Sequence, residues 1–213
     1  MGRRGPKPRK REAISRAALE LFVERGVKGA TTREIARRAH STEGSLYRYY
    51  AGKQDLAHRV LAQCLASLGE CVARALAEVA GPRLRLRTYV RRYLEYAREN
   101  PLEHAFATQS RLQRPLVLDE ESSRPRTLLV DILSDGIAHG AFYPCDARRI
   151  APFLLGGLNH AFPTNAAERD REAVERAMDE LVSAVERLVV IPGTWHHPRD
   201  VQLSVPSEPG PLG

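Results

Sequence analysis

The stretch TTREIARRAHSTEGSLYRYYAGKQDL, residues 31–56, contains two short helix patterns separated by a tight turn. Thr31 is followed three residues later by Glu34, which is the capping-box pattern of a helix start. Thr42 can cap a second helix through its side-chain oxygen. Two short helices joined by a tight turn are typical of a helix-turn-helix, whose second helix enters the major groove of DNA. The predicted helices cover residues 31–39 and 42–50.

The three tyrosines of the second predicted helix point in different directions. Leu46 and Tyr50 are four residues apart and share one helix face, which we expect to face the core. Tyr47 and Arg48 lie on other faces, and Arg48 could reach a guanine or a phosphate. Tyr49 is expected at the rim between these faces. The sequence therefore predicts that the tyrosines divide between packing and contact with a partner.

Basic charge is concentrated at the N-terminus of the chain. Residues 1–53 hold 14 Lys and Arg against 5 Asp and Glu, whereas the other 160 residues hold 19 against 21. The excess predicts a polyanionic partner, and it favours nucleic acid because no basic helix carries a strongly exposed apolar face for a membrane surface. A solvated basic surface without a partner is the alternative that charge alone leaves open.

Helical patterns continue along the chain and predict an all-α protein. Apolar residues from Ile14 to Phe22 repeat on one face of a first helix, for which Gly26 supplies the C-terminal stop. A helix from Lys53 to about Ala80 is long enough to join two domains. Further helices are expected at about 83–99, 102–113, 122–139, from Asp146 onward, and 168–190.

Residues TTREIARRA and GSLYRYYAGKQDL resemble the N-terminal domain of the tetracycline-repressor (TetR) family of transcription regulators. The correspondence covers about residues 12–61, and the order of helices extends it over most of the remainder. The resemblance implies a three-helix helix-turn-helix domain joined to a helical ligand-binding and dimerisation domain. We therefore predict a basic disordered arm at 1–11, a DNA-binding domain at 12–55, an effector-binding and dimerisation domain at 56–191 and a disordered tail at 192–213.

The resemblance also implies which residues contact DNA. The hydroxyl and ammonium donors of Thr32, Tyr47 and Lys53 would bind phosphates. Gly44 and Ser45 would approach base edges, because a missing side chain lets the helix sink into the groove. The predicted DNA-contacting residues are Thr31, Thr32, Arg33, Thr42, Glu43, Gly44, Ser45, Tyr47, Arg48 and Lys53.

Three departures from the family pattern fall in this region. His40 and Ser41 stand where Gly and Val are usual, so the turn must accept a side chain, and His tolerates a positive φ better than most residues other than Gly. Glu43 replaces a common Lys. Its carboxylate suits the helix dipole, and it either repels phosphate or accepts a hydrogen bond from a cytosine amine. Gly52 replaces a Ser cap.

Two C-terminal segments predict a homodimer. The run APFLLGGL at 151–158 is apolar on every face, and apolar residues after Ala173 recur at near-heptad spacing. The resemblance implies a four-helix bundle of the last two helices of each subunit, and a two-fold protein matches a palindromic operator. An intramolecular core is the alternative. The predicted interface residues are Phe153, Leu154, Gly156, Gly157, Leu158, Met178, Leu181, Val185 and Leu188.

The middle helices resemble the effector-binding region of the family. Aromatic residues recur there at helical spacing, although such a stripe is more often core. An apolar lining with a few polar groups would suit a small hydrophobic or aromatic effector. The candidate pocket residues are Tyr89, Tyr93, Tyr96, Phe106, Gln109, Arg111, Asn159 and His160.

The sequence gives no support to other classes of function. The GxSxG, GxGxxG and P-loop patterns are absent, which disfavours an enzyme or carrier built on a helical bundle. The His and Cys residues show no metal-ligand spacing, so neither a metal nor a cofactor is expected. Without a secretory signal or a membrane-length apolar run, we expect a cytoplasmic protein that acts as a ligand-responsive repressor. An activator, or a regulator without an effector, fits the sequence equally.

Overall fold

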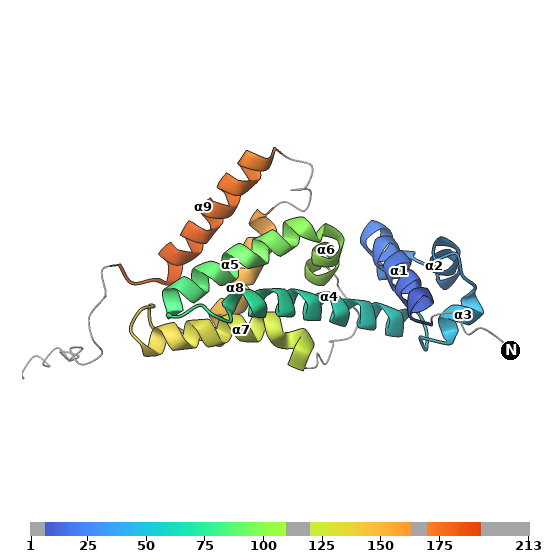
Figure 1. Ribbon diagram of the computed structural model, residues 1–213, viewed down its shortest axis with the longest axis horizontal. Coiled ribbons are helices and arrows are strands. Elements are labelled where there is room, and N and C mark those ends of the chain that lie inside the picture. The colour runs from blue at the N-terminus through green and yellow to red at the C-terminus, as the bar shows by residue number, and fades with distance from the viewer. Residues whose placement is uncertain (1–6, 110–119, 163–169, 193–213) are drawn as a thin grey trace, which may run out of the picture.

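The computed structural model describes residues 7–109, 120–162 and 170–192 of the 213-residue chain, and within these ranges the protein is helical. A long central helix, α4, connects a small N-terminal group of helices with a larger C-terminal group (Figure 1). The helices are α1 (Lys7–Gly29), α2 (Thr32–Arg38), α3 (Glu43–Tyr47), α4 (Lys53–Leu76), α5 (Pro82–Glu99), α6 (Pro101–Gln109), α7 (Glu120–Ala138), α8 (Ala147–Ala161) and α9 (Arg171–Val189).

The N-terminal group packs around the first half of α4. Its apolar core contains Ile14, Ile35, Leu46 and Leu56, all of which are fully buried. The predicted capping box of α2 is confirmed, since the Thr31 hydroxyl accepts from the Glu34 amide at 3.2 Å and the Thr31 amide donates to the Glu34 carboxylate at 3.1 Å. Local caps therefore fix where α2 begins, and the core fixes how it packs.

The N-terminal helix starts earlier than the sequence predicts. Helix α1 begins at Lys7, so the expectation of a disordered arm is wrong for residues 7–11. Proline is tolerated in a first helical turn and the basic residues that follow are good helix formers, which explains the extension. Gly26 has a φ of 70° and a ψ of 164°, which are not helical, so the first helical segment of α1 stops at Gly26 as predicted and a short second segment continues after the kink to Gly29. Residues 1–6 of the predicted arm, and the predicted tail from residue 193 on, lie outside the described residues.

The C-terminal group forms a second apolar core between α4, α5, α7, α8 and α9. Helices α4 and α7 lie side by side, and α7 approaches so closely that a Cβ atom on Gly69 would stand 3.0 Å from the Arg124 Cβ. The Tyr89 hydroxyl donates to the Pro125 carbonyl of α7 at 2.7 Å, which satisfies a buried polar group at this contact.

The end of α9 is fastened to the segment between α7 and α8. Phe142 and Val190 form an isolated antiparallel bridge, in which the Tyr143 amide donates to the Val189 carbonyl at 2.9 Å. The Phe142 ring is buried directly against Gly136 of α7. The bridge fixes where α9 ends relative to α7 and α8.

Replacing Gly136 with Ala should lower the free energy of unfolding by about 2 kcal/mol, because the core has no room for the added methyl group. The new Cβ would lie 2.1 Å from the Phe142 Cδ2 atom. Urea unfolding measures the loss. In a double-mutant cycle, Gly136→Ala should cost nothing further in a Phe142→Ala background, and an undiminished cost there would contradict the proposed clash.

Candidate DNA-binding surface and effector region

Helix α3 ends at Tyr47, three residues before the predicted end at residue 50, but the tyrosines at and just after its end divide as the sequence predicts. Leu46 and Tyr50 are buried, and the Tyr50 hydroxyl hydrogen-bonds the Ser15 hydroxyl of α1 at 2.8 Å. Tyr47 is 54% exposed, and Arg48 is exposed beside it. Tyr49 is half-buried with the Arg48 guanidinium 5.3 Å from its ring centroid. One face of α3 is therefore anchored in the core, and the other presents a phenol and a guanidinium to solvent.

The turn before α3 is destabilised locally by His40 and Ser41, which stand where the family usually has Gly and Val. His40 adopts a φ of 47°, which confirms that a side chain occupies a position with positive φ. The Ser41 amide donates to the Ala36 carbonyl at 2.8 Å, but the Ser41 hydroxyl is buried without a hydrogen-bond partner among the described residues. Thr42 then caps α3, accepting from the Ser45 amide at 3.2 Å. These hydrogen bonds stabilise the turn although His40 has a positive φ and the Ser41 hydroxyl is buried without a partner among the described residues.

Removal of one hydroxyl from Tyr47 or from Tyr50 should affect different properties. Tyr47→Phe should weaken DNA binding several-fold on every sequence without changing Tm, since its hydroxyl is exposed. Tyr50→Phe should instead cost about 1 kcal/mol of stability, since it breaks the hydrogen bond to Ser15. Thermal melts and anisotropy titrations of both variants test this division, and an equal loss of Tm in both would contradict it.

Two of the predicted phosphate-contacting side chains are already engaged within the protein. The Thr32 hydroxyl donates to the Glu43 carboxylate at 3.0 Å, which ties the start of α2 to the start of α3. The Lys53 ammonium donates to the Ala30 carbonyl at 2.7 Å and to the Lys28 carbonyl at 3.2 Å. Lys53 thus satisfies carbonyls at the end of α1 and positions α4 against it, a role that the sequence alone does not reveal.

Ion pairs neutralise some arginines of this domain and leave others available. Arg38 hydrogen-bonds Glu24 and holds the pKa of that carboxyl below its usual value. The hydrogen bond from Thr31 is the main reason that the pKa of Glu34 is lowered, and Arg25 adds to it. In α2 and the turn after α3, the described residues give Arg33, Arg37 and Arg48 no carboxylate partner, and all three are exposed. These guanidiniums can bind phosphate or a base.

The middle helices bring together a polar cluster of the buried Tyr93 and His104 and the half-buried Asn159. The Tyr93 hydroxyl donates to the Asn159 side-chain oxygen at 2.6 Å, and the Tyr93 ring stacks on Tyr89 at 6.2 Å between centroids. The His104 ring meets Tyr93 edge-on at 5.5 Å. The His104 side chain is only 6% exposed, and this burial lowers its pKa to about 4. The ring is therefore neutral at pH 7.

His104 is the member of this cluster that sequence reasoning missed. Its Nε2 atom has no hydrogen-bond partner within the described residues, which is unusual for a buried polar group. The sequence does offer a signal, since His104 stands in the otherwise apolar stretch HAFA of α6, yet a lone buried histidine has no spacing motif. The cluster joins α5, α6 and α8 at one point.

Other candidate pocket residues do not join this cluster. Tyr96 is buried in the C-terminal core, whereas Phe106 stacks on Phe22 of α1 at 5.6 Å and so belongs to the N-terminal core. His160 is exposed near the end of α8. The expectation that Phe106 and His160 line one pocket with Tyr93 is therefore corrected. The side chain of Gln109, and Arg111 as a whole, lie outside the described residues.

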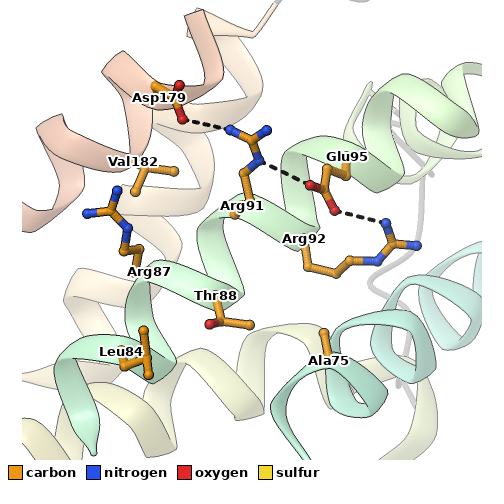
Figure 2. A pocket seen from close by; sticks show the side chains of 9 residues that line it. All are labelled: Ala75, Leu84, Arg87, Thr88, Arg91, Arg92, Glu95, Asp179 and Val182. Carbon is orange, nitrogen blue, oxygen red and sulfur yellow. Dashed lines mark hydrogen bonds and ion pairs between the residues drawn. The ribbon is translucent and has the colours of Figure 1, made fainter. Parts of the chain in front are cut away.

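A surface groove of about 380 Å³ lies between α4, α5 and α9, and none of the predicted effector residues lines it (Figure 2). Arg91 of α5 pairs with Glu95 at 3.0 Å, with Asp179 at 2.7 Å and also with Glu175. Arg87 and Arg92 are paired with carboxylates too. The groove is therefore a neutralised ionic contact that holds α9 on α5, rather than an anion site. Its lining is Ala75, Leu84, Arg87, Thr88, Arg91, Arg92, Glu95, Asp179 and Val182.

The structure divides the predicted dimer residues into two sets. Met178 and Val185 are buried in the core of their own chain, and so are Leu154 and Leu158, which corrects the expectation that they face a partner. The apolar stripe of α9 packs against the core of its own chain. The same side chains therefore cannot also contact a second subunit. The remaining residues are solvent-accessible: Phe153 (68% exposed), Leu188 (60%), Gly156, Gly157 and the half-buried Leu181.

In the described part of the chain, no helix has the length and apolar character needed to cross a bilayer.

Comparisons with known proteins agree with this geometry. The profile of the family described as "Bacterial regulatory proteins, tetR family" matches residues 14–60. The chain is similar to the "HTH-type transcriptional regulator RutR" of Escherichia coli O157:H7, with 24% identity over 193 residues, 85% of this chain and 89% of RutR. It is 28% identical over 145 residues to the "HTH-type transcriptional repressor KstR2" of Mycolicibacterium smegmatis, which spans 63% of this chain and 68% of KstR2.

A solved structure supports the fold over most of the chain. The regulator FadR of Bacillus subtilis, in complex with stearoyl-CoA, superposes with a TM-score of 0.64 at 20% identity. The superposition covers 81% of this chain and 97% of FadR. The all-helical arrangement is thus shared at low sequence identity, and the helix-turn-helix segment is the part matched by the family profile.

Proposed function

Because this chain belongs to the tetracycline-repressor family of bacterial transcription regulators, we propose that it is a homodimeric repressor that binds a palindromic operator and is released by a small hydrophobic or aromatic effector. The observation that carries the proposal is α3 with the turn that follows it, in which Leu46 and Tyr50 lie in the core while Tyr47 and Arg48 face solvent. A recognition helix needs this combination of a rigid inner face and an exposed polar outer face. The protein would act in the cytoplasm, where its DNA is.

The division of labour along the chain follows the two apolar cores. We assign DNA binding to residues 12–55, and effector binding with dimerisation to residues 56–191. One core joins α1, α2 and α3 to the start of α4, and the other joins the rest of α4 to α5, α7, α8 and α9. Helix α4 contributes residues to both cores, so a movement of the C-terminal domain would be transmitted to the N-terminal domain through this helix.

The dimer would form through the faces of α8 and α9 that their own chain leaves uncovered. Phe153, Gly156 and Gly157 lie on one side of α8, and the two glycines have open space around their Cα atoms. On α9, Leu188 is exposed, and Leu181 on the same face is half-buried against its own core. Together Phe153 and Leu188 offer apolar side chains that a partner would cover, and glycines allow two helices to approach closely. A two-fold pair of these faces would give a four-helix bundle.

The effector would bind near the polar cluster of Tyr93, His104 and Asn159. A neutral histidine with an unpartnered Nε2 atom can exchange a hydrogen bond with an uncharged polar group of a ligand. The surrounding aromatic and aliphatic side chains would hold an apolar body. FadR of Bacillus subtilis, which shares the fold, was solved with stearoyl-CoA, a ligand with a long apolar chain.

Effector binding would release DNA by moving α6 and α4 relative to the N-terminal helices. Helix α6 carries His104 and also contacts α1, since Arg16 pairs with Glu103 at 2.8 Å and Phe22 stacks on Phe106. A shift of α6 therefore pulls on α1 directly. The two recognition helices of a dimer must fit successive major grooves about 34 Å apart, so a small rotation of each domain is enough to weaken binding.

Titration of DNA binding against salt tests the proposed operator contact. Affinity measured by fluorescence anisotropy on genomic fragments selected with the purified protein should fall at least about 100-fold between roughly 50 and 200 mM salt, because several phosphates release counterions. A nearly constant affinity over this range would contradict the proposal. The genes beside the selected fragments would then indicate the pathway of the effector.

A further inference from the structure

Glu43 is the acidic residue at the start of the exposed recognition helix, and its carboxylate is held in place by another helix. We propose that Glu43 selects a cytosine at one position of each operator half-site and that Thr32 is its positioning residue. The proposal rests on the operator binding proposed above and adds the base that this side chain reads.

The contacts of Glu43 differ from those of the other carboxylates nearby. Glu20, Glu24, Glu34 and Asp55 each pair with an arginine. Glu43 has no cationic partner among the described residues. It is half-buried, and its Oε2 atom accepts the Thr32 hydroxyl at 3.0 Å. The second oxygen of a carboxylate held in this way still offers lone pairs to a donor outside the protein.

The pattern of donors and acceptors in the major groove restricts which base can donate a hydrogen bond to the Glu43 carboxylate. A carboxylate is an acceptor only, and guanine and thymine present acceptor oxygens at the corresponding edge. Adenine has an amine but also the N7 acceptor beside it, which repels a carboxylate. Cytosine presents its N4 amine alone, and Glu is a known partner of that amine. A negative charge near phosphates is unfavourable unless such a donor compensates it, so the contact contributes selectivity rather than general affinity.

The hydrogen bond also revises the role of Thr32. A hydroxyl has one proton, and while it is donated to Glu43 it cannot be donated to a phosphate. The bond crosses from the first turn of α2 to the first residue of α3, and it limits the rotamers of a long side chain. Thr32 therefore acts on one base through Glu43, whereas a phosphate contact would act on all sequences alike.

Selection of bound sequences from a random duplex library tests the proposal with the full-length protein and three variants. Wild type should enrich cytosine at one position of each half-site. Glu43→Gln should change that preference to adenine, because an amide both donates to N7 and accepts from N6. Thr32→Val should relax the preference at the same position. Glu70→Gln, an equal charge change at an exposed residue of α4, should leave the sequence logo unchanged.

Affinity for duplexes that differ only at this position gives the size of the effect. Wild type should prefer cytosine by roughly 5- to 100-fold, and Glu43→Gln should lose that preference while its Tm stays close to that of wild type. Identical base preferences in wild type and Glu43→Gln would overturn the proposal. A Thr32→Val variant that binds all sequences more weakly, with its base preference intact, would overturn the positioning role. Failure of the wild type to enrich any sequence would instead refute operator binding itself.

Discussion

Phe153→Glu should convert the proposed dimer into a monomer and lower the affinity for a full palindromic operator by at least about 100-fold. Phe153 is 68% exposed in the single chain, beside Gly156 and Gly157 on α8. In the proposed four-helix bundle its replacement would place a carboxylate from each subunit in an apolar contact, which costs several kcal/mol when the charge is unpaired. Loss of the second half-site contact removes an avidity of about 10²- to 10⁴-fold.

Analytical ultracentrifugation gives the oligomeric state, and anisotropy on full and half operators gives the affinity. Affinity for a single half-site should stay close to that of wild type, because α8, which carries Phe153, lies in the C-terminal group of helices and away from α3 (Figure 1). Leu84→Glu is the matched control, since Leu84 is 54% exposed on α5 and lines the ionic groove instead. A dimeric Phe153→Glu with unchanged operator affinity would refute the proposed interface.

Lowering the pH from 7 toward 4 should destabilise the protein through His104 by up to about 3 kcal/mol. Burial lowers the pKa of His104 from 6.5 to about 4 in the folded state. Below pH 6.5 the unfolded chain binds a proton that the folded chain excludes. Above about pH 6.5 the ring is neutral in both states, so His104 does not lower the free energy of unfolding there. Between pH 6.5 and 4 this free energy falls progressively as the unfolded chain binds the proton.

Urea unfolding of wild type and His104→Gln at several pH values isolates this contribution from the titration of surface carboxylates. The variant should lose less stability than wild type between pH 6.5 and 4, because it has no proton to gain there. His139→Gln serves as the control, since His139 is exposed just after the end of α7. Parallel curves for wild type and His104→Gln would show that His104 does not carry the effect.

The same ring offers a functional check on the effector region. If an effector exchanges a hydrogen bond with His104, its binding should raise the stability of wild type more than that of His104→Phe, which keeps the aromatic packing against Tyr93 and removes the unpartnered nitrogen. The stacking geometry would persist, so a difference would report the lost hydrogen bond.

The sequence by itself determined the features of this protein that depend on neighbours within a few residues. The capping box of Thr31 and Glu34, the cap at Thr42 and the positive φ of His40 are all readable from local residue types. The pairing of Tyr50 with Leu46 on the buried side is also local, since positions four apart share a face in a helical turn, whereas Tyr47 lies on another face. The family motif follows from these same residues.

Only the tertiary structure decided which helix face meets which neighbour. A periodic stripe shows that a helix is amphipathic without naming its partner, so the stripe of α9 that contains Met178 and Val185 could not be assigned between its own core and a second subunit. For the same reason Phe106 could not be assigned to the N-terminal core, nor His104 to the polar cluster with Asn159. Such contacts depend on how separate helices are placed in three dimensions, which no local pattern encodes.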